Sequence, residues 1–303
     1  MSAESSSGLS MSGFYRLIDF GQGRKLEELD GYRIDRPSPA AVGISRRSAQ
    51  QWRDCDAKYD AKRREWTFRT PWPEHLQINC GGFSMPVRPT PYGHIGLFPE
   101  QASNWKWIRQ LGSELCSSLN RNESESAISA LNLFGYTGAS TMAMVSSGLA
   151  VAHVDAAKPN VQSCREAAEI NGWQAAPVRY LVDDALKFAQ REVRRHKRYH
   201  MIVLDPPAYG HSPQGKAWRL ERDLWPLLDA CVELLDEQFA ILVTGHSPEV
   251  DSGDVVGYLK PLLARRSVSV GADLQIETGR SSLESAAGLQ LDTGFFARLW
   301  SLA

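Results

Sequence analysis

The sequence contains no uninterrupted apolar run of about 18 residues, so no membrane-spanning helix is expected. Its opening, MSAESSSGLSMSG, lacks both the basic segment and the apolar segment of a secretory signal peptide. These residues are small and polar, which is typical of a disordered tail, predicted here over residues 1–12. With 43% hydrophobic and 23% charged residues, we expect a globular protein of the cytoplasm.

The cysteines are too scattered to form a structural framework. Their number is odd and no two form a C-x-x-C pair; they are Cys55, Cys80, Cys116, Cys164 and Cys231. This spacing argues against a disulfide network and against a zinc site. We therefore expect reduced thiols and no bound metal.

An excess of positive charge is also missing. The net charge is −1 with histidine neutral, whereas proteins that bind nucleic acid are often more basic. Local patches remain, namely Arg191, Arg194, Arg195, Lys197 and Arg198 in one cluster, and Lys62, Arg63 and Arg64 near Trp66 in another. The first cluster fits phosphate binding, and it fits equally well the solvated C-terminus of a helix.

The first third of the chain has the pattern of extended structure. Aromatic and β-branched residues recur over 14–20, 31–39, 64–71 and 75–91, and Gly or Pro residues punctuate these segments. The pattern predicts a small β-rich module over residues 13–90. Its tryptophans, Trp52, Trp66 and Trp72, are predicted to lie in the module's core.

Over residues 91–303, apolar strands alternate with amphipathic helices. Buried-type strands are predicted within 128–138, 151–157, 178–185, 199–210 and 239–247, with helical segments between them. This alternation is that of βαβ units and predicts an α/β, Rossmann-like domain with a mostly parallel sheet and helices on both faces. Two further strands, within 268–279 and 289–300, are predicted to form an antiparallel edge.

In such a sheet, ligands bind at the carboxyl ends of the strands. The first strand runs into the glycine turn 132–138, NLFGYTG, which has a G-x-x-G spacing but not the G-x-G-x-x-G of dinucleotide-binding proteins. The second strand ends at Asp155, about 20 residues beyond the turn, where a carboxylate can accept hydrogen bonds from ribose hydroxyls. Asp155 fits equally well the cap of the next helix.

The third and fourth strands also end in acids. Asp183-Asp184 is placed either to meet an adenine amine or to cap a helix. The fourth strand ends in LDPPAYG (204–210), where consecutive prolines fix the backbone and leave nearby carbonyls without ladder partners. Together with Asp205 these carbonyls would form a rigid set of acceptors, and Tyr209 would offer its ring to a base.

These segments, taken together, resemble class I S-adenosylmethionine-dependent methyltransferases. More narrowly, residues 92–303 resemble the bacterial ribosomal RNA large-subunit methyltransferases that modify cytosine C5 or guanine N7. The matching pieces are GHIGLFPEQ (93–101), LNLFGYTG (131–138), HVDAAK (153–158), NGW (171–173), DDALKF (183–188) and LDPPAYG (204–210).

The resemblance implies a role for each matching residue. Phe98 and Gln101 would close over the cofactor, S-adenosyl-L-methionine. Its methionine part would be wrapped by Asn132, Phe134, Gly135, Tyr136, Thr137 and Gly138. Asp155 would hold the ribose, with Ala156 beside the adenine, and Asp184 and Ala185 would contact the adenine. Asp205, Pro206, Pro207 and Tyr209 would face the methyl acceptor.

One loop departs from the family pattern. Relatives that make 5-methylcytosine carry a cysteine in a Ser-Cys-Ser sequence after the fifth strand, where this chain has Thr244-Gly245-His246-Ser247. Carbon methylation needs a thiolate that adds to the ring, so the sequence argues against it. Methylation of nitrogen or oxygen stays open, with Asp205 or His246 as the proton acceptor. His246 fits a structural loop histidine as well.

The sequence therefore predicts a methyltransferase that modifies a base in RNA, with ribosomal RNA as the expected partner. Two alternatives remain. The acceptor could be a small molecule or a protein side chain, which would suit the near-neutral charge. The chain could also be a non-catalytic RNA-binding or assembly factor, which the altered loop would suit. A nicotinamide-dependent oxidoreductase is disfavoured by the missing third glycine.

Overall fold

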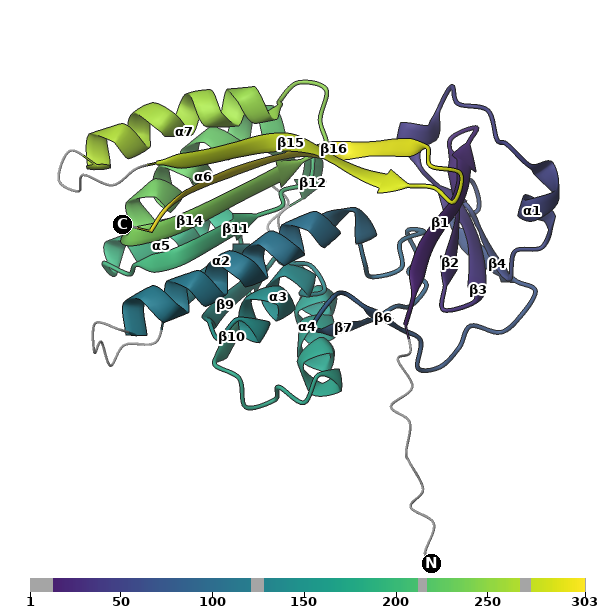
Figure 1. Ribbon diagram of the computed structural model, residues 1–303, viewed down its shortest axis with the longest axis horizontal. Helices are drawn as coiled ribbons and strands as arrows, with labels where there is room; N and C mark the ends of the chain where they lie inside the picture. The colour runs from purple at the N-terminus through teal and green to yellow at the C-terminus, as the bar shows by residue number, and fades with distance from the viewer. Residues whose placement is uncertain (1–12, 121–127, 212–216, 268–273, 303) are drawn as a thin grey trace, which may run out of the picture.

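The computed structural model describes residues 13–120, 128–211, 217–267 and 274–302. The predicted disordered tail, residues 1–12, lies outside this range. A small sheet at one end of the molecule meets a larger sheet flanked by helices (Figure 1). In the described part of the chain, no helix is long and apolar enough to cross a membrane.

The small sheet, called here the N-terminal sheet, has five strands in the order β1-β2-β3-β4-β5. They are β1 (Tyr15–Gly21), β2 (Arg24–Leu29), β3 (Tyr32–Pro37), β4 (Ala57–Asp60) and β5 (Glu65–Phe68). The turn between β2 and β3 has positive φ at both Asp30 and Gly31, which suits a tight two-residue hairpin. β2 was not predicted, because its charged residues suggested an exposed segment. In the structure, Lys25 and Glu27 of this strand are buried and form ion pairs.

Shorter elements complete the first ninety residues. They are the one-turn helix η1 (Pro39–Ala41), the helix α1 (Ala49–Arg53) and a separate hairpin of β6 (Gln77–Asn79) and β7 (Ser84–Pro86). Trp52 is buried, as predicted, whereas Trp66 and Trp72 are half-buried and pack against the core. The predicted boundary at residue 90 stays a prediction, since buried residues from both sides of it share one cluster.

The large sheet has the order β10-β9-β8-β11-β14-β16-β15. Five strands are parallel, namely β8 (Ser129–Leu133), β9 (Ala150–Asp155), β10 (Val178–Val182), β11 (Tyr199–Leu204) and β14 (Leu235–Gly245). β15 (Gln275–Glu284) and β16 (Gln290–Ser301) form the antiparallel edge. The α/β class and the antiparallel edge are confirmed, although residues 268–273 of one predicted edge strand lie outside the described residues.

Helices cover both faces of this sheet (Figure 1). One face packs against α2 (Ala102–Asn120), α3 (Ala139–Ser146) and α4 (Lys158–Ile170), and the other against α5 (Ala185–Arg194), α6 (Leu220–Leu234) and α7 (Ser252–Ser267). Neighbouring strand residues alternate between the two cores, as in β8, where Ala130 faces the first and Leu131 the second. α7 was not predicted from the sequence.

The strand order reverses between β8 and β11, and this places a crevice at their carboxyl ends. The N-terminal sheet reaches that end by docking on the tip of the β15–β16 hairpin (Figure 1). Leu17 bridges to Ser285, and its carbonyl accepts a hydrogen bond from Ala286 N at 2.8 Å. Phe20 and Leu283 belong to the apolar cluster at this junction. The two sheets therefore enclose the crevice together.

Candidate active site

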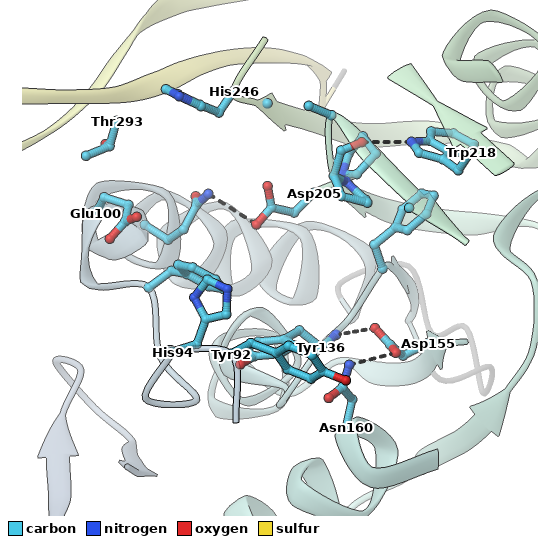
Figure 2. Close-up of a pocket in the computed structure, with 18 of the residues that line it drawn as sticks. Tyr92, His94, Glu100, Tyr136, Asp155, Asn160, Asp205, Trp218, His246 and Thr293 are labelled. Carbon is cyan, nitrogen blue, oxygen red and sulfur yellow. Dashed lines mark hydrogen bonds between the residues drawn. The ribbon is translucent and has the colours of Figure 1, made fainter. Parts of the chain in front are cut away.

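A cavity of about 840 Å³ occupies this crevice (Figure 2). Residues from the ends of β9, β11 and β14 line it, together with parts of the N-terminal sheet and of loop 92–101. The volume lies in the upper part of the range for sites that bury a drug-sized ligand. No group of three or more potential metal ligands occurs among the described residues.

The glycine turn after β8 is held in an unusual conformation. Phe134 and Tyr136 have φ of 56° and 48°, values that residues other than glycine rarely adopt, and both line the cavity. The turn is held by Gly135 N, which donates to Val154 O at 2.9 Å, and by Tyr136 N, which donates to Asp155 Oδ2 at 2.8 Å. Such strain persists where the surroundings impose it, and it often marks a ligand site.

The two glycines of the turn are required by close packing. A Cβ on Gly135 would lie 2.5 Å from His153 Nδ1, and one on Gly138 would lie 2.2 Å from Cys164 Sγ. Gly138 also has a φ of 95°, which favours glycine. Neither glycine lines the cavity, so the turn approaches its neighbours closely on the side away from the ligand space.

Asn132 and Thr137 support the turn from behind. Asn132 is buried and donates from Nδ2 to Thr141 Oγ1 at 2.9 Å, while Thr137 donates from Oγ1 to Gly96 O at 2.5 Å. Neither residue lines the cavity. Of the residues expected to wrap a methionine group, the structure brings Phe134 and Tyr136 to the cavity and leaves the other four behind it.

Asp155, at the end of β9, has a fixed carboxylate on the cavity wall. Besides Tyr136 N, it accepts hydrogen bonds at Oδ1 from Ala157 N at 2.9 Å and from Asn160 Nδ2 at 3.0 Å. Figure 2 shows the contacts of Asp155 with Tyr136 and Asn160 on the lower side of the cavity. A carboxylate held in this way is preorganised for hydroxyl donors, and the neighbouring Ala156 lines the cavity beside it.

Asp184 caps a helix and also faces the cavity. It is the N-cap of α5 and accepts from Lys187 N at 3.0 Å, so the helix-cap interpretation is confirmed. Asp184 and Ala185 both line the cavity. The neighbouring Asp183 is paired with Arg191. Helix capping and contact with a ligand are compatible at Asp184, because the cap uses one carboxylate oxygen.

Asp205, at the end of β11, is the central acidic group of the cavity. Its Oδ1 accepts from Thr244 Oγ1 at 2.5 Å and its Oδ2 from Gln101 Nε2 at 3.3 Å. Figure 2 shows Asp205 between His246 and Asp155. Burial raises the pKa of Asp205 to about 6, and the Thr244 hydrogen bond opposes this rise. The charge of Glu100 adds to it. Asp205 can therefore both lose and accept a proton near neutral pH.

The proline loop offers fewer free carbonyls than the sequence suggested. Pro207 O accepts from Trp218 Nε1 at 2.8 Å, and Ala208 O accepts from Leu220 N at 3.0 Å. Within the described residues, no donor is bonded to Pro206 O. Pro206 and Pro207 both line the cavity. The expected array of acceptors is thus reduced to Asp205 and the Pro206 carbonyl.

Tyr209 does not face the cavity, contrary to the sequence prediction. It is 57% exposed and begins β12 (Tyr209–His211), which pairs with β13 (Ala217–Arg219). Successive residues of a strand point to opposite sides, so Gly210 lines the cavity while Tyr209 points away. The aromatic group at this position is instead Trp218, whose ring lies 4.9 Å from that of Phe134.

The remaining predicted residues lie on the cavity wall. Phe98 packs between His94 and Tyr136, with ring centroids 5.4 Å from each. Gln101 reaches Asp205 and accepts from Asn104 Nδ2 at 2.6 Å. His246, after β14, lines the cavity on its upper side in Figure 2.

Several wall residues were missed by the sequence analysis. They are Lys25 and Arg36 of the N-terminal sheet, His94, Glu100, Trp218 and Thr293. Burial lowers the pKa of His94, and the charges of Arg36 and Lys25 lower it further. Only His94 and Glu100 lie within a segment that resembles the methyltransferase family, GHIGLFPEQ (93–101). The others belong to elements that tertiary packing brings to the cavity.

The larger basic cluster lies away from the cavity. It falls at the end of α5 and just before β11 begins at Tyr199, which is the amino edge of the parallel sheet. The cavity lies at the opposite, carboxyl edge. Arg191 pairs with Asp183 and Arg195 with Glu192. The helix-end interpretation of this cluster is therefore favoured over phosphate binding near the site.

None of the cysteines lines the cavity. Burial raises the pKa of each thiol, to about 12 for Cys80 and for Cys164. A nucleophilic cysteine needs a lowered pKa, so these five lack the environment of an activated thiolate.

The chain is similar to known proteins in parts of its sequence and in its fold. No family model matches it. A ribosomal RNA large subunit methyltransferase K/L of Methylococcus capsulatus is 32% identical over 108 residues, which is 35% of this chain and 15% of the relative. A ribosomal RNA large subunit methyltransferase K of Neisseria meningitidis is 29% identical over 107 residues, 35% of this chain and 30% of the relative. The chain thus spans less than a third of the length of either relative.

The fold is matched over nearly the whole chain. A crystal structure of the SAM-dependent methyltransferase from Agrobacterium tumefaciens is 28% identical, with a TM-score of 0.84 that covers 97% of this chain and 92% of that one. The resemblance drawn from the sequence motifs is confirmed by these similarities. The chain has the methyltransferase fold, preceded by a β-rich module.

Proposed function

We propose that this protein transfers a methyl group from S-adenosylmethionine to a nitrogen or oxygen of a base in ribosomal RNA. The observation that carries the proposal is Asp205, a half-buried carboxyl on the cavity wall that is held by Thr244 and Gln101 and whose pKa is raised to about 6. Support for the cofactor comes from the fold, and support for the RNA acceptor comes from the names of the relatives. Such an acceptor would place the protein in the cytoplasm.

The cavity fits the cofactor on three observations. The Asp155 carboxylate is fixed by three donors and can accept from ribose hydroxyls. Ala156, Asp184 and Ala185 form the adjoining wall for an adenine. The strained residues Phe134 and Tyr136, with Phe98 above them, would enclose the methionine part. When bound, S-adenosylmethionine supplies an electrophilic methyl group.

Asp205 and Pro206 would orient the acceptor. Asp205 and the Pro206 carbonyl can accept N–H donors from an exocyclic amine, which directs the nitrogen lone pair toward the methyl position. Thr244 and Gln101 hold the two oxygens of Asp205 in place. After transfer, the nitrogen carries an extra proton, and Asp205 would accept it because its pKa lies near the working pH. His246 is the second candidate for this proton.

The choice of nitrogen or oxygen rests on the missing thiolate. Methylation of a ring carbon requires a nucleophile that adds to the base, and no cysteine lines the cavity. A lone pair on nitrogen or oxygen needs no such step. Positioning, exclusion of water and acceptance of a proton suffice, and the described wall can provide all three.

The chemistry of the product tests this proposal. RNA from cells that lack the protein is incubated with the enzyme and methyl-labelled cofactor, then digested to nucleosides and separated by chromatography. We expect the label in an N- or O-methylated nucleoside. Label in 5-methylcytidine would contradict direct transfer, and label in protein or small molecules alone would assign a different acceptor.

A further inference from the structure

Two buried cations of the N-terminal sheet face the same cavity. Lys25 and Arg36 are 5% and 3% exposed, and both line the cavity wall. Their common partner is Glu27, which is fully buried. Arg36 donates to Glu27 from Nε at 2.5 Å and from Nη2 at 2.9 Å, while Lys25 Nζ lies 3.1 Å from Glu27 Oε1.

The hydrogen-bond donors of this cluster are not all used. Lys25 and Arg36 share the Glu27 carboxylate, and the charge of Glu100 also favours the charged form of Arg36. Glu27 takes two of the five N–H donors of Arg36 and one of the three of Lys25. Glu100 lines the same cavity, but among the described residues it forms no ion pair with either cation. Donors therefore remain for a ligand.

Most of the other charged residues on the cavity wall are acidic. Among the described residues that line it, Lys25 and Arg36 are the only lysine or arginine. The other charged lining residues are carboxylates, namely Glu100, Asp155, Asp183, Asp184 and Asp205. Among the described lining residues, these two are therefore the permanent positive charges with which an anionic group of a ligand can form an ion pair.

Their position points to the acceptor rather than the adenosine. Helix η1 follows β3 directly and packs against β16, at the antiparallel edge of the large sheet. Asp155 ends β9 and Asp184 follows β10, and these two strands lie at the other side of the sheet. Figure 2 shows Asp205 between these two sides, with His246 and Thr293 above it and Asp155 below.

We propose that Lys25 and Arg36 bind the phosphate of the nucleotide whose base is methylated, an inference that rests on the RNA acceptor proposed above. A base that leaves its stack to enter an active site carries its sugar-phosphate along. Arginine and lysine are the usual partners of that phosphate. The N-terminal sheet would then be part of the acceptor site rather than a separate docking module.

Lys25→Gln tests this inference. The variant removes one charge, but the glutamine amide can still donate a hydrogen bond to Glu27. Glu27 also retains its two hydrogen bonds from Arg36. Lys25→Arg preserves the charge. Lys58→Gln is the matched control, because Lys58 belongs to the same sheet, is 58% exposed at its side chain and lies outside the cavity wall. Thermal unfolding of all variants shows whether they are folded.

The readouts are KM for RNA in methyl transfer and Kd for S-adenosylhomocysteine by calorimetry. We expect Lys25→Gln to raise KM roughly ten- to hundredfold, the usual effect of losing a charged hydrogen bond, with an unchanged Kd. Lys25→Arg and Lys58→Gln should keep KM within about twofold. An unchanged KM in Lys25→Gln would overturn the proposal.

Two other outcomes are distinct. A loss of S-adenosylhomocysteine affinity in Lys25→Gln, with KM for RNA unaffected, would assign the cations to the methionine carboxylate and overturn the phosphate assignment. If the wild type transfers no methyl group to RNA although it binds S-adenosylhomocysteine, the proposed function itself is wrong, and the phosphate assignment falls with it.

Discussion

Replacement of Asp205 by asparagine should stabilise the folded protein above pH 6. The pKa of Asp205 is raised from its ordinary value of 3.8 to about 6 by burial. Because the folded pKa is the higher one, the ionised carboxylate lowers the free energy of unfolding. That penalty is absent below pH 3.8, grows between pH 3.8 and 6, and is fully present above pH 6.

The size of the effect follows from the two pKa values. A difference of about 2 units corresponds to about 3 kcal/mol, since each unit is worth about 1.4 kcal/mol. Asparagine stays neutral and its oxygen can still accept from Thr244. Loss of the Gln101 contact should cost about 1 kcal/mol at every pH. The dependence on pH therefore carries the prediction.

Urea unfolding at pH 4.5 and pH 8 measures this dependence. Relative to wild type, the free energy of unfolding of Asp205→Asn should increase by about 2 kcal/mol more at pH 8 than at pH 4.5. Asp30→Asn, at an exposed turn, is the control and should show no such dependence. A difference between Asp205→Asn and wild type that is equal at both pH values would refute the reasoning.

Three further outcomes are expected. Methyl transfer should fall about tenfold per pH unit below pH 6, because protonation removes the acceptor on Asp205; a flat kcat/KM profile from pH 5 to 8 would argue against that role. Asp155→Ala should weaken S-adenosylhomocysteine binding tenfold or more by calorimetry, whereas Asp205→Ala should reduce turnover more than affinity. Replacing Arg194 and Lys197 together by alanine should leave KM for RNA unchanged, since these residues lie at the far edge of the sheet; a marked rise would show that RNA crosses that edge.

The parallel core of the fold could be predicted from local pattern. Each of β8, β9 and β11 is a short apolar run, and the residues that follow it are glycines or acids that suit a turn, a cap or a ligand. Alternation of β and α segments then determines the sheet and the edge at which these ends meet. Phe134, Tyr136, Asp155 and Asp205 reached the cavity for this reason.

The parts of the fold and of the site that were not predicted depend on tertiary contacts, which the local sequence pattern does not indicate. β2 was missed because Lys25 and Glu27 look exposed, yet they are buried through each other and through Arg36. Tyr209 was placed wrongly because a short hairpin turns its ring outward. The aromatic ring expected on the cavity wall from Tyr209 is supplied instead by Trp218, which lies in a segment without any recognisable motif.

The different roles of the residues in the glycine turn could not be predicted either. The sequence could not separate residues that face a ligand from those that hold the turn from behind. Asn132 and Thr137 belong to the second group, because each uses its polar group on a buried neighbour. Their replacement should act through the conformation of Phe134 and Tyr136 rather than through a lost ligand contact.

The central claim is that Asp205 serves methyl transfer to RNA. The most direct test measures incorporation of labelled methyl from S-adenosylmethionine into large-subunit ribosomal RNA taken from cells without this protein. Wild type should label that RNA, and Asp205→Ala should lose most of the label while still binding S-adenosylhomocysteine. Equal labelling by both proteins, or none by a wild type that binds the cofactor, would contradict the account.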